Sequence, residues 1–307
     1  METTAKTWDV IGIGTAAVDD LLLVEDFPKP DSKVDILEST RQGGGQTATA
    51  MAAAARHEAR AAFCCNLGFD DFSVFTMREL EKEGVDCSPC ILTATGSPYH
   101  STIIVDLKHH SRTILHTGGN VAPPDDHITQ ELIGRAKVLF LDDNSRLAGV
   151  KAAAIARKLG IPVIADFEPD PPPEYEKLLA LIDHLVVGKE FAGWLSGEKT
   201  EAAMAEALVT QERSCCVVTA GERGCWYCTR GTRAVHAPGF AVQVVDTTGC
   251  GDVFHGVYAA AVARGEPVAR AVRLANASAA LKATQPGGRL GIPTLAQAEA
   301  FIRSRSS

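Results

Sequence analysis

One short segment, residues 244–256, carries the residue types that transfer of a phosphoryl group needs. It reads Val-Val-Asp-Thr-Thr-Gly-Cys-Gly-Asp-Val-Phe-His-Gly, so a carboxylate, Asp252, directly follows a glycine-rich turn. Glycines at 249 and 251 permit left-handed backbone and a close approach by a ligand. A helix that begins close to Asp252 would leave free N–H groups that hold phosphate oxygens. Asp252 would then accept a hydroxyl proton while the amides stabilise the negative charge of the group in flight.

The same carboxylate has a simpler interpretation. Aspartate is a favoured N-cap, so Asp252 could serve only to begin the helix. A short glycine turn by itself does not separate a catalytic carboxylate from a capping one.

The complete string 246–252 is far more specific, because it resembles the C-terminal signature of the ribokinase-like (PfkB) carbohydrate kinases. The resemblance implies that Asp252 is the catalytic base. It also implies that backbone amides of Gly249, Cys250 and Gly251 form an anion hole for the transferred phosphate. The family usually has alanine at the position of Cys250, and a backbone donor tolerates that exchange.

Two N-terminal segments resemble the sugar-binding parts of the same family. Asp19 closes the segment Gly-Thr-Ala-Ala-Val-Asp, and a carboxylate can accept two hydroxyl hydrogen bonds from a polyol. The adjacent Asp20 is the alternative carboxylate. Residues 42–50 resemble a diglycine turn that enters a sugar-contacting helix, with Thr49 where the family commonly has asparagine. The sugar contacts implied by this segment are Gly44, Gly45, Gln46 and Thr49.

The nucleotide site is implied by the resemblance alone. Residues 218–224 resemble the strand and turn beneath ATP, and a late helix would line the purine pocket. The implied nucleotide contacts are Thr219, Gly221, Gly224, Asn276 and Ala279.

Two kinds of cation are also implied. The turn 285–288 resembles a loop that completes a monovalent-cation site, which places potassium near the backbone of Asp246 and Thr248. Magnesium is expected because phosphoryl transfer from ATP requires the charge of the nucleotide to be neutralised. The family's Asn-x-x-Glu segment, which helps to place magnesium, is replaced here by residues 188–191. Glu190 is the substitute expected to act indirectly on that ion.

Short apolar runs alternate with amphipathic stretches, which indicates βαβ units around a largely parallel sheet. The resemblance implies a ribokinase-like three-layer αβα sandwich in one domain over residues 1–307. Strands are expected at Val10–Ile13, Ala61–Cys64, Val138–Leu141, Pro162–Ala165, His184–Val187 and Cys215–Val218. Helices are expected at Thr47–Arg56, Phe72–Glu83, Ala148–Leu159 and Ala202–Val209, with a long helical stretch over Gly251–Thr284.

Segments 20–38 and 98–116 break this rhythm with alternation at period two, which is typical of half-exposed antiparallel strands. They predict a small β-sheet lid that covers a ligand or pairs with a second subunit, since an exposed sheet edge can do both. Lys33 and Arg112 lie in these segments. If either points inward, the substrate would carry an anionic substituent. The alternative is that both charges face solvent.

The composition excludes several classes of protein. The 307 residues include 38 acidic and 30 basic ones, a net charge of −8, and no basic block that would favour nucleic acid. No apolar run approaches the roughly 20 residues of a membrane span, and the N-terminus lacks the pattern of a signal peptide. A cytoplasmic location is therefore expected. Nine cysteines favour a reducing compartment, and the pairs Cys87/Cys90 and Cys225/Cys228 are interpreted as buried thiols rather than zinc ligands.

These patterns predict ATP-dependent phosphorylation of a sugar hydroxyl. Segments 111–115, 244–256 and 282–292 look most like ketose kinases, namely ketohexokinase, fructokinases and sulfofructose kinase, so a ketose such as fructose or a derivative is expected. One alternative is an adenosine-type nucleoside kinase, which would need an aromatic slot. Few of the 18 aromatic residues lie near Asp19 or Gly44. The other is a non-catalytic sugar- or nucleotide-sensing protein.

Overall fold

A sheet of eight strands forms the centre of the protein in the computed structural model, which describes residues 6–109, 111–169 and 172–305. The strand order is β14-β13-β12-β11-β10-β9-β1-β4. The six strands from β12 to β4 are parallel, and β13 and β14 add an antiparallel edge. All six predicted strands are confirmed. The bounds are β1 Trp8–Ile13, β4 Ala61–Cys64, β9 Ala136–Asp142, β10 Val163–Asp166, β11 His184–Gly188, β12 Cys215–Thr219, β13 Cys225–Thr229 and β14 Val235–Ala237.

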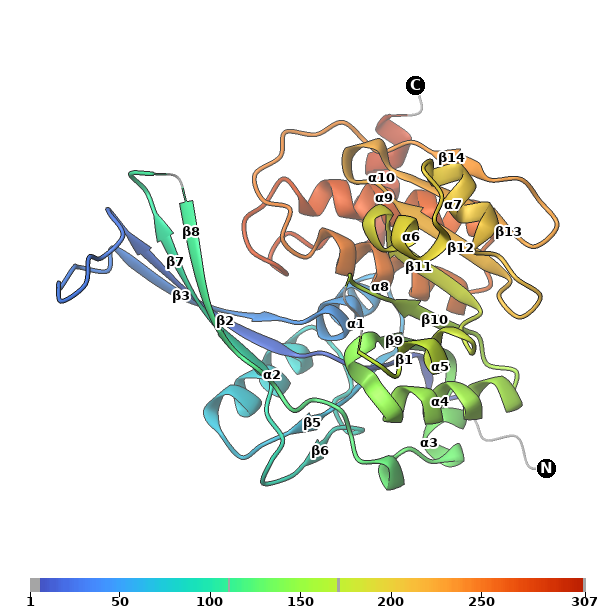
Figure 1. Ribbon diagram of the computed structural model, residues 1–307, viewed down its shortest axis with the longest axis horizontal. Coiled ribbons are helices and arrows are strands. Elements are labelled where there is room, and N and C mark those ends of the chain that lie inside the picture. The colour runs from blue at the N-terminus through green and yellow to red at the C-terminus, as the bar shows by residue number, and fades with distance from the viewer. Residues whose placement is uncertain (1–5, 110, 170–171, 306–307) are drawn as a thin grey trace.

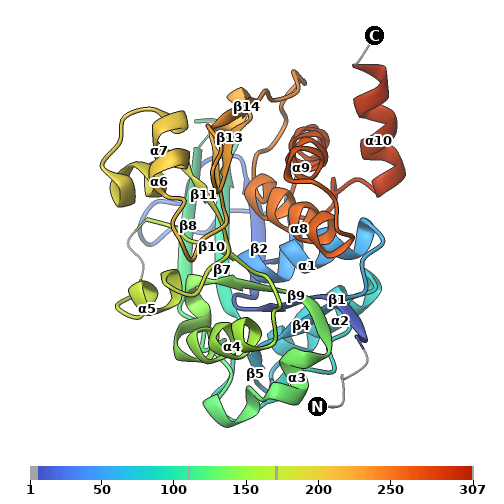
Figure 2. The same cartoon turned by 90° about the vertical axis from the view of Figure 1, so that its right-hand side faces the viewer.

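Helices cover both faces of this sheet, as Figure 2 shows. One layer contains α1 Gln46–Arg56, α2 Asp71–Lys82, α8 Cys250–Ala263, α9 Val268–Lys282 and α10 Leu295–Ser304. The other contains α3 Gln130–Gly134, α4 Arg146–Lys158, α5 Tyr175–Leu179, α6 Lys189–Ser196 and α7 Glu201–Ala207. Short elements connect them: β5 Asn66–Leu67, β6 Ile91–Leu92, η1 Asp125–His127, η2 Asp143–Ser145 and η3 Gly221–Arg223. This is the three-layer αβα arrangement that the sequence predicts.

Two hydrophobic cores account for the apolar runs of the central strands. Val138 and Phe140 of β9 pack into the core under α1 and α8, whereas Leu139 and Leu141 pack into the core under α4. Successive side chains of a strand point to opposite faces, so a strand buried on both faces must be apolar throughout. The same geometry separates Cys225 and Cys228 of β13 into different cores, and all nine cysteines are free.

The predicted long helical stretch over 251–284 is wrong in one respect, because it is two helices. α8 ends at Ala263 and α9 begins at Val268. Gly265 between them has φ of 77°, a left-handed conformation that ends helices, and Pro267 precedes α9 without an N–H group to continue one. The alanine-rich composition on both sides of this turn hid the break.

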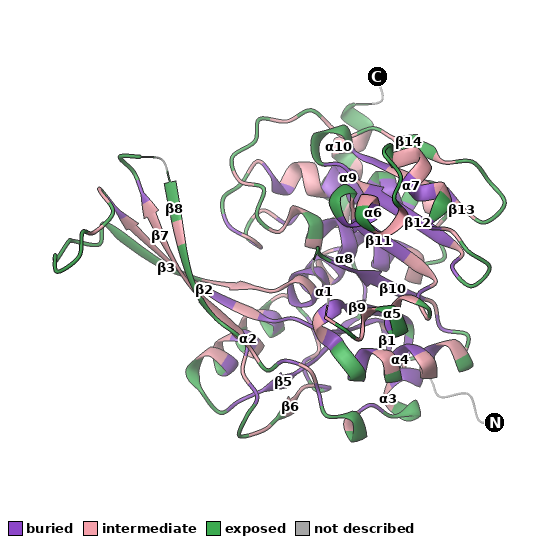
Figure 3. Ribbon diagram, viewed as in Figure 1, coloured by how far each residue is buried: buried purple, intermediate pink, exposed green. Residues whose placement is uncertain are grey.

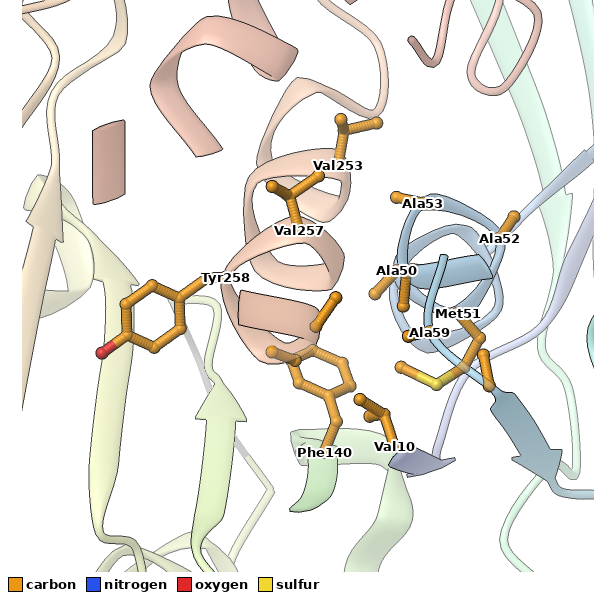
Figure 4. Close-up of a cluster of buried hydrophobic side chains, with 14 of the residues drawn as sticks. Val10, Ala50, Met51, Ala52, Ala53, Ala59, Phe140, Val253, Val257 and Tyr258 are labelled. Atoms are coloured by element: carbon orange, nitrogen blue, oxygen red, sulfur yellow. The ribbon is translucent and has the colours of Figure 1, made fainter. Parts of the chain in front are cut away.

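Helix α8 lies directly against α1, and Figure 4 shows Val253 and Val257 facing Ala50 and Ala53 across the contact. The approach depends on Gly256, since a Cβ at this position would lie 1.9 Å from the carbonyl oxygen of Ala50. We therefore expect Gly256→Ala to lower the free energy of unfolding by about 1–3 kcal/mol through overpacking, although alanine favours helices. Denaturant unfolding measures this, and an unchanged midpoint would contradict the close contact.

The lid is a four-stranded sheet that projects from the body, as Figure 1 shows. Its order is β3-β2-β7-β8, with bounds β2 Ala17–Val24, β3 Glu38–Gly44, β7 Tyr99–Asp106 and β8 Ser111–Thr117. Most of its residues are half-exposed or exposed, which is visible in Figure 3. The predicted lid is present, but β2 and β7 pair in parallel rather than antiparallel fashion, and residues 25–37 form a connection. Strand β3 extends to Gly44, past the predicted limit at residue 38. The sequence did not predict this extension, because β3 is polar and contains glycine and so lacks the apolar alternation that marks its neighbours.

No described helix is long and apolar enough to cross a membrane.

Candidate active site

The carboxyl ends of four parallel strands meet at one edge of the large sheet. Asp142 ends β9, Asp166 ends β10, Gly188 ends β11 and Thr219 ends β12. In open α/β sheets ligands bind at this edge, where the strand ends present side chains and free backbone groups together. Asp252, in the first turn of α8, reaches the same edge, because Asp166 and Glu168 both act on its carboxyl group electrostatically.

Asp252 is not the N-cap of its helix, so the capping interpretation is excluded. The N-cap is Gly249, whose φ of 74° is left-handed, and Asp252 is the third residue of α8. Its carboxylate has no hydrogen-bond partner within the described chain, and the residue is only half-buried. The side chain is therefore available to a ligand.

Burial raises the pKa of Asp252 to about 7, and the charge of Asp166 adds to the effect. The charge of Glu168 also raises the pKa of Asp252, whereas the charges of His255 and Arg289 lower it. A carboxylate with a pKa near neutrality is a much better proton acceptor than an ordinary aspartate and is still partly ionised at pH 7.

The turn before Asp252 offers backbone donors. The N–H groups of Gly249 and Gly251 have no acceptor among the described residues, whereas that of Cys250 donates to Thr247 O at 3.1 Å. Two of the three predicted anion-hole amides are thus free, and the third closes the turn. A Cβ at Gly249 would lie 2.8 Å from Gly288 O, so this glycine is required by the fold as well.

Gly251 differs, because a Cβ there would meet no protein atom within 4 Å. We expect Gly251→Ala to leave the thermal unfolding temperature unchanged or raised, since alanine favours helices. Its kcat should fall roughly tenfold to a hundredfold if phosphate oxygens pack against this amide. Melting and steady-state rates measure the two effects. Full activity would show that no ligand approaches Gly251. Gly256→Ala on the same helix is the matched control, because it should lower stability through a clash with Ala50 O.

On the sugar side, the structure distinguishes the two candidate carboxylates. The carboxylate of Asp20 already has two partners: Arg41 Nε donates to its Oδ1 at 2.6 Å, and His100 Nε2 lies 2.9 Å from its Oδ2. Asp19 faces Gly44 instead, with its Oδ2 2.8 Å from where a Cβ on Gly44 would lie. Burial raises the pKa of Asp19, and a hydrogen bond from Ser101 partly offsets that effect. Asp19 is therefore the carboxylate that remains for a ligand.

The glycine segment beside Asp19 positions the start of α1. Gly45 is the N-cap with φ of 91°, and a Cβ there would lie 2.6 Å from Ala16 Cα. Gln46 reaches the sheet edge, with its Nε2 3.5 Å from Asp166 Oδ2. Thr49 does not present its hydroxyl to an open site, because it is buried and accepts a hydrogen bond of 3.2 Å from Arg289 Nε.

The exposure of Lys33 and Arg112 favours the alternative in which both charges face solvent. Lys33 lies in the exposed connection 25–37, which Figure 1 shows at the outer end of the lid. Arg112 is exposed on β8 opposite Val105, four residues along β7 from Ser101, the residue that contacts Asp19. Four residues of strand span about 13 Å. Alternation fixes the face of a side chain but not its distance from the site.

Of the predicted nucleotide residues, Thr219, Gly221 and Gly224 lie at or just after the end of β12, and Asn276 and Ala279 lie on α9. Thr219 Oγ1 donates to Val187 O at 3.4 Å, and Gly221 and Gly224 have φ of 58° and 83°. Asn276 is buried and donates to Ala237 O at 3.0 Å, so it holds the chain after β14. Ala279 O accepts the thiol of Cys250 at 3.5 Å. This contact joins α9 to the glycine turn.

A profile of the pfkB family of carbohydrate kinases matches residues 9–295. The chain belongs to the pfkB family of carbohydrate kinases. Ribokinase of Haemophilus influenzae is 26% identical over 94% of this chain and 97% of its own length. The ATP-dependent ribose-1-phosphate kinase of Halopiger xanaduensis is 29% identical over 96% of this chain and 98% of its own length. The structure of Arabidopsis thaliana ribokinase with ribose and ATP has the same fold, with a TM-score of 0.85, 22% identity and coverage of 96% of this chain and 98% of that one.

The position where this pfkB kinase was predicted to bind potassium is already crowded. Asp246 Oδ1 accepts from Thr248 N at 2.9 Å and its Oδ2 from Gly287 N at 2.8 Å. Its carbonyl oxygen accepts from the ammonium of Lys282 at 2.9 Å. Burial alone would raise the pKa of Asp246, but the two amides and the charge of Lys282 outweigh it, and the pKa is lowered.

Carboxylates at the sheet edge are suited to a hydrated magnesium ion. Burial, followed by the charge of Glu168, raises the pKa of Asp166, and burial with nearby charges raises that of Asp143 to about 7. A divalent cation would favour the ionised form of such clustered carboxyl groups, and magnesium binds through one or two carboxylates while keeping several waters. Glu190 is exposed, and its Oε1 lies 3.6 Å from Lys189 Nζ.

Sequence reasoning missed Arg289, which links the substrate side of this kinase to its C-terminal loop. The residue is 8% exposed; Nη2 donates to Gly44 O at 2.6 Å and Nε to Thr49. Its Nη1 lies where a side chain on Gly43 would be, 2.5 Å from the position of a Cβ. An arginine directly after a diglycine turn resembles a surface charge in sequence, and only the packing of β3 on this loop reveals its burial.

Proposed function

We propose that this protein transfers the γ-phosphoryl group of ATP to a primary hydroxyl of a sugar, with Asp252 as general base. The observation that supports this most is the unpartnered carboxylate of Asp252, with a pKa near 7, beside the free amides of Gly249 and Gly251. A proton acceptor and an anion hole in one helical turn are the two parts that phosphoryl transfer to an alcohol requires.

The sugar lies between Asp19 and the glycine segment on one side and Asp252 on the other. Asp252 takes the proton of the attacking hydroxyl, whose oxygen forms a bond to the γ-phosphorus as the bond to the β,γ-bridging oxygen of ATP breaks. The amides of Gly249 and Gly251 hold the charge on the transferred group. ATP lies along Thr219 and the turn at Gly221, and closure of the lid keeps water from competing with the sugar.

Magnesium supplies charge neutralisation of the nucleotide when bound. Asp166 and Glu168 are the carboxylates that would hold its water ligands, with Glu190 reaching it from the nucleotide side. Among the described residues the only group of three side chains close enough to ligate one metal directly is Asp26, Asp106 and His109, in the lid.

For the substrate we propose a neutral sugar, with a ketose such as fructose first and ribose as the competing class. The segments that resemble ketose kinases support the ketose, whereas the curated relatives named above act on ribose or its 1-phosphate. A neutral sugar is favoured because Lys33 and Arg112 lie away from Asp19 and Arg289 is covered by β3. The nucleoside-kinase and sensor alternatives stay open to the test below.

We also propose that residues 1–307 act as one kinase unit, cytoplasmic, and that two copies pair through the lid. Half or more of each of four large apolar side chains is exposed on or beside β3 and β8: Ile36, Leu37, Ile114 and Leu115. Burying such side chains favours association. Sedimentation of the wild type beside a variant with Leu37 and Leu115 changed to glutamate tests this, and two monomeric proteins would contradict it.

The first experiment is ADP release from magnesium-ATP with a panel of ketoses, aldoses, acidic sugars and nucleosides. We expect turnover on a neutral ketose or pentose well above the rate without sugar. Turnover only on nucleosides would replace the proposed substrate. Binding of both ATP and a sugar without ADP release would support the sensor alternative instead.

A further inference from the structure

The ammonium of Lys282 is fully buried behind the glycine turn that forms the anion hole. Lys282 is the last residue of α9 and has 0% exposure. Its Nζ donates to the carbonyl oxygen of Asp246 at 2.9 Å. No carboxylate of the described chain lies within the 4.0 Å of Nζ that defines an ion pair, so a backbone carbonyl is its direct partner.

Such an arrangement costs stability. A buried charge without an ion-pair partner loses hydration that one hydrogen bond does not replace, and apolar residues of similar volume are often at least as stable in its place. The position of this charge must therefore serve something other than packing. Its partner, Asp246, begins the turn that ends at Gly249, the N-cap of the catalytic helix.

Both ends of Asp246 are held at the same time. Its carboxylate accepts the amides of Thr248 and Gly287, while its carbonyl accepts the ammonium. The turn is thereby fixed to α9 and to the C-terminal loop. The charge also reaches the first residue of α8, since burial raises the pKa of the Cys250 thiol and Lys282 acts against that rise.

A desolvated monovalent cation on a carbonyl oxygen is also what a potassium ion would supply at this place. Two positive charges cannot share one carbonyl at hydrogen-bond distance without strong repulsion, because Coulomb energies of close charges in a protein interior reach several kcal/mol. The residues present here do not fit potassium beside Asp246.

We propose that Lys282 is a built-in cation that takes the place of a monovalent metal ion and positions the anion-hole turn. Lys282 is fully buried and acts through Asp246, so it is a positioning residue. The proposal rests on the proposed phosphoryl transfer and goes beyond it, because it predicts an enzyme that does not depend on potassium.

The first test uses the wild type alone, so it does not depend on the folding of any variant. Steady-state rates are measured in tetramethylammonium buffer, with potassium, sodium or ammonium chloride added at constant ionic strength. We expect changes of less than about twofold in kcat, since the cation site is already filled. A rise of about tenfold with potassium, equivalent to 1.4 kcal/mol of transition-state stabilisation, would overturn the proposal while leaving the kinase itself intact.

The second test asks whether a free cation can replace the side chain. Lys282→Ala opens a space beside Asp246 O, and Lys282→Met fills it without charge. We expect both to lose kcat by about tenfold or more. Potassium, ammonium or methylammonium should restore Lys282→Ala severalfold and leave Lys282→Met unchanged. Lys199→Ala, which removes an exposed lysine, is the control and should match the wild type.

A third measurement needs no sugar. Potassium should raise the thermal unfolding temperature of Lys282→Ala above its value in tetramethylammonium. The same exchange of cations should change the unfolding temperatures of the wild type and of Lys199→Ala by equal, smaller amounts. Full activity of Lys282→Met in the absence of added cations would overturn the positioning role. Absence of turnover in the wild type on every sugar would instead count against the proposed function, so the two failures are distinguishable.

Discussion

Replacing Asp252 by asparagine should lower kcat by at least about a hundredfold, the order expected when a general base is lost. The amide is nearly isosteric but cannot accept the hydroxyl proton. ATP affinity should be nearly unchanged, because the amides of Gly249 and Gly251 and the turn at Gly221 are untouched. Single-turnover transfer from labelled ATP, together with calorimetric ATP binding, measures both quantities.

The variant should also fold at least as well as the wild type. The fold raises the pKa of Asp252 to about 7, mainly by burial, so it disfavours the ionised carboxylate that predominates above that pH. A neutral asparagine removes this effect, and the unfolding temperature at pH 8 should rise or stay constant. Asp126→Asn, at an exposed carboxylate in η1, is the control. A folded Asp252→Asn enzyme with wild-type turnover would remove Asp252 from the mechanism.

The rate should fall by about tenfold per pH unit below pH 7, because the base must be deprotonated to act. The sign follows from the raised pKa: an ordinary aspartate would stay ionised down to about pH 4, whereas Asp252 gains its proton near pH 7. Burial is the largest cause of the raised pKa and the charge of Asp166 is the second, whereas the charges of His255 and Arg289 lower it.

The profile is measured as kcat/KM for the sugar from pH 5 to 9, at saturating magnesium-ATP and constant ionic strength. Asp252→Asn is the control, since its residual rate should not fall below pH 7 in the same way. An equally steep limb in that variant would assign the titration to another group. A flat wild-type profile between pH 5 and 8 would contradict a base with a pKa near 7.

Much of this fold follows from periodicity. Strands such as β9 are apolar on both faces because they lie between two helical layers, and continuous apolar runs report that directly. The break at Gly265 and the extension of β3 to Gly44 were not predicted. In both cases the local pattern was dominated by residues that suit more than one conformation, and tertiary contacts decided between them.

The site was predictable where one short segment carries it, as around Asp252. It was not predictable where a residue acts through a distant partner. The resemblance implied Thr49 as a sugar contact because of its place in a glycine segment, but Arg289, 240 residues away, donates a hydrogen bond to its hydroxyl. Nothing in the sequence singled out Lys282, and only its contact with Asp246, 36 residues earlier, gives its charge a role.

The most direct test of the central claim is phosphorus NMR of wild-type protein with magnesium-ATP and each of fructose and ribose, read beside Asp252→Asn. The account predicts a new sugar-phosphate resonance that grows as ADP forms in equal amount, with none from the variant in the same time. ATP that stays intact with every sugar, or that is hydrolysed to inorganic phosphate at the same rate by both proteins, would contradict it.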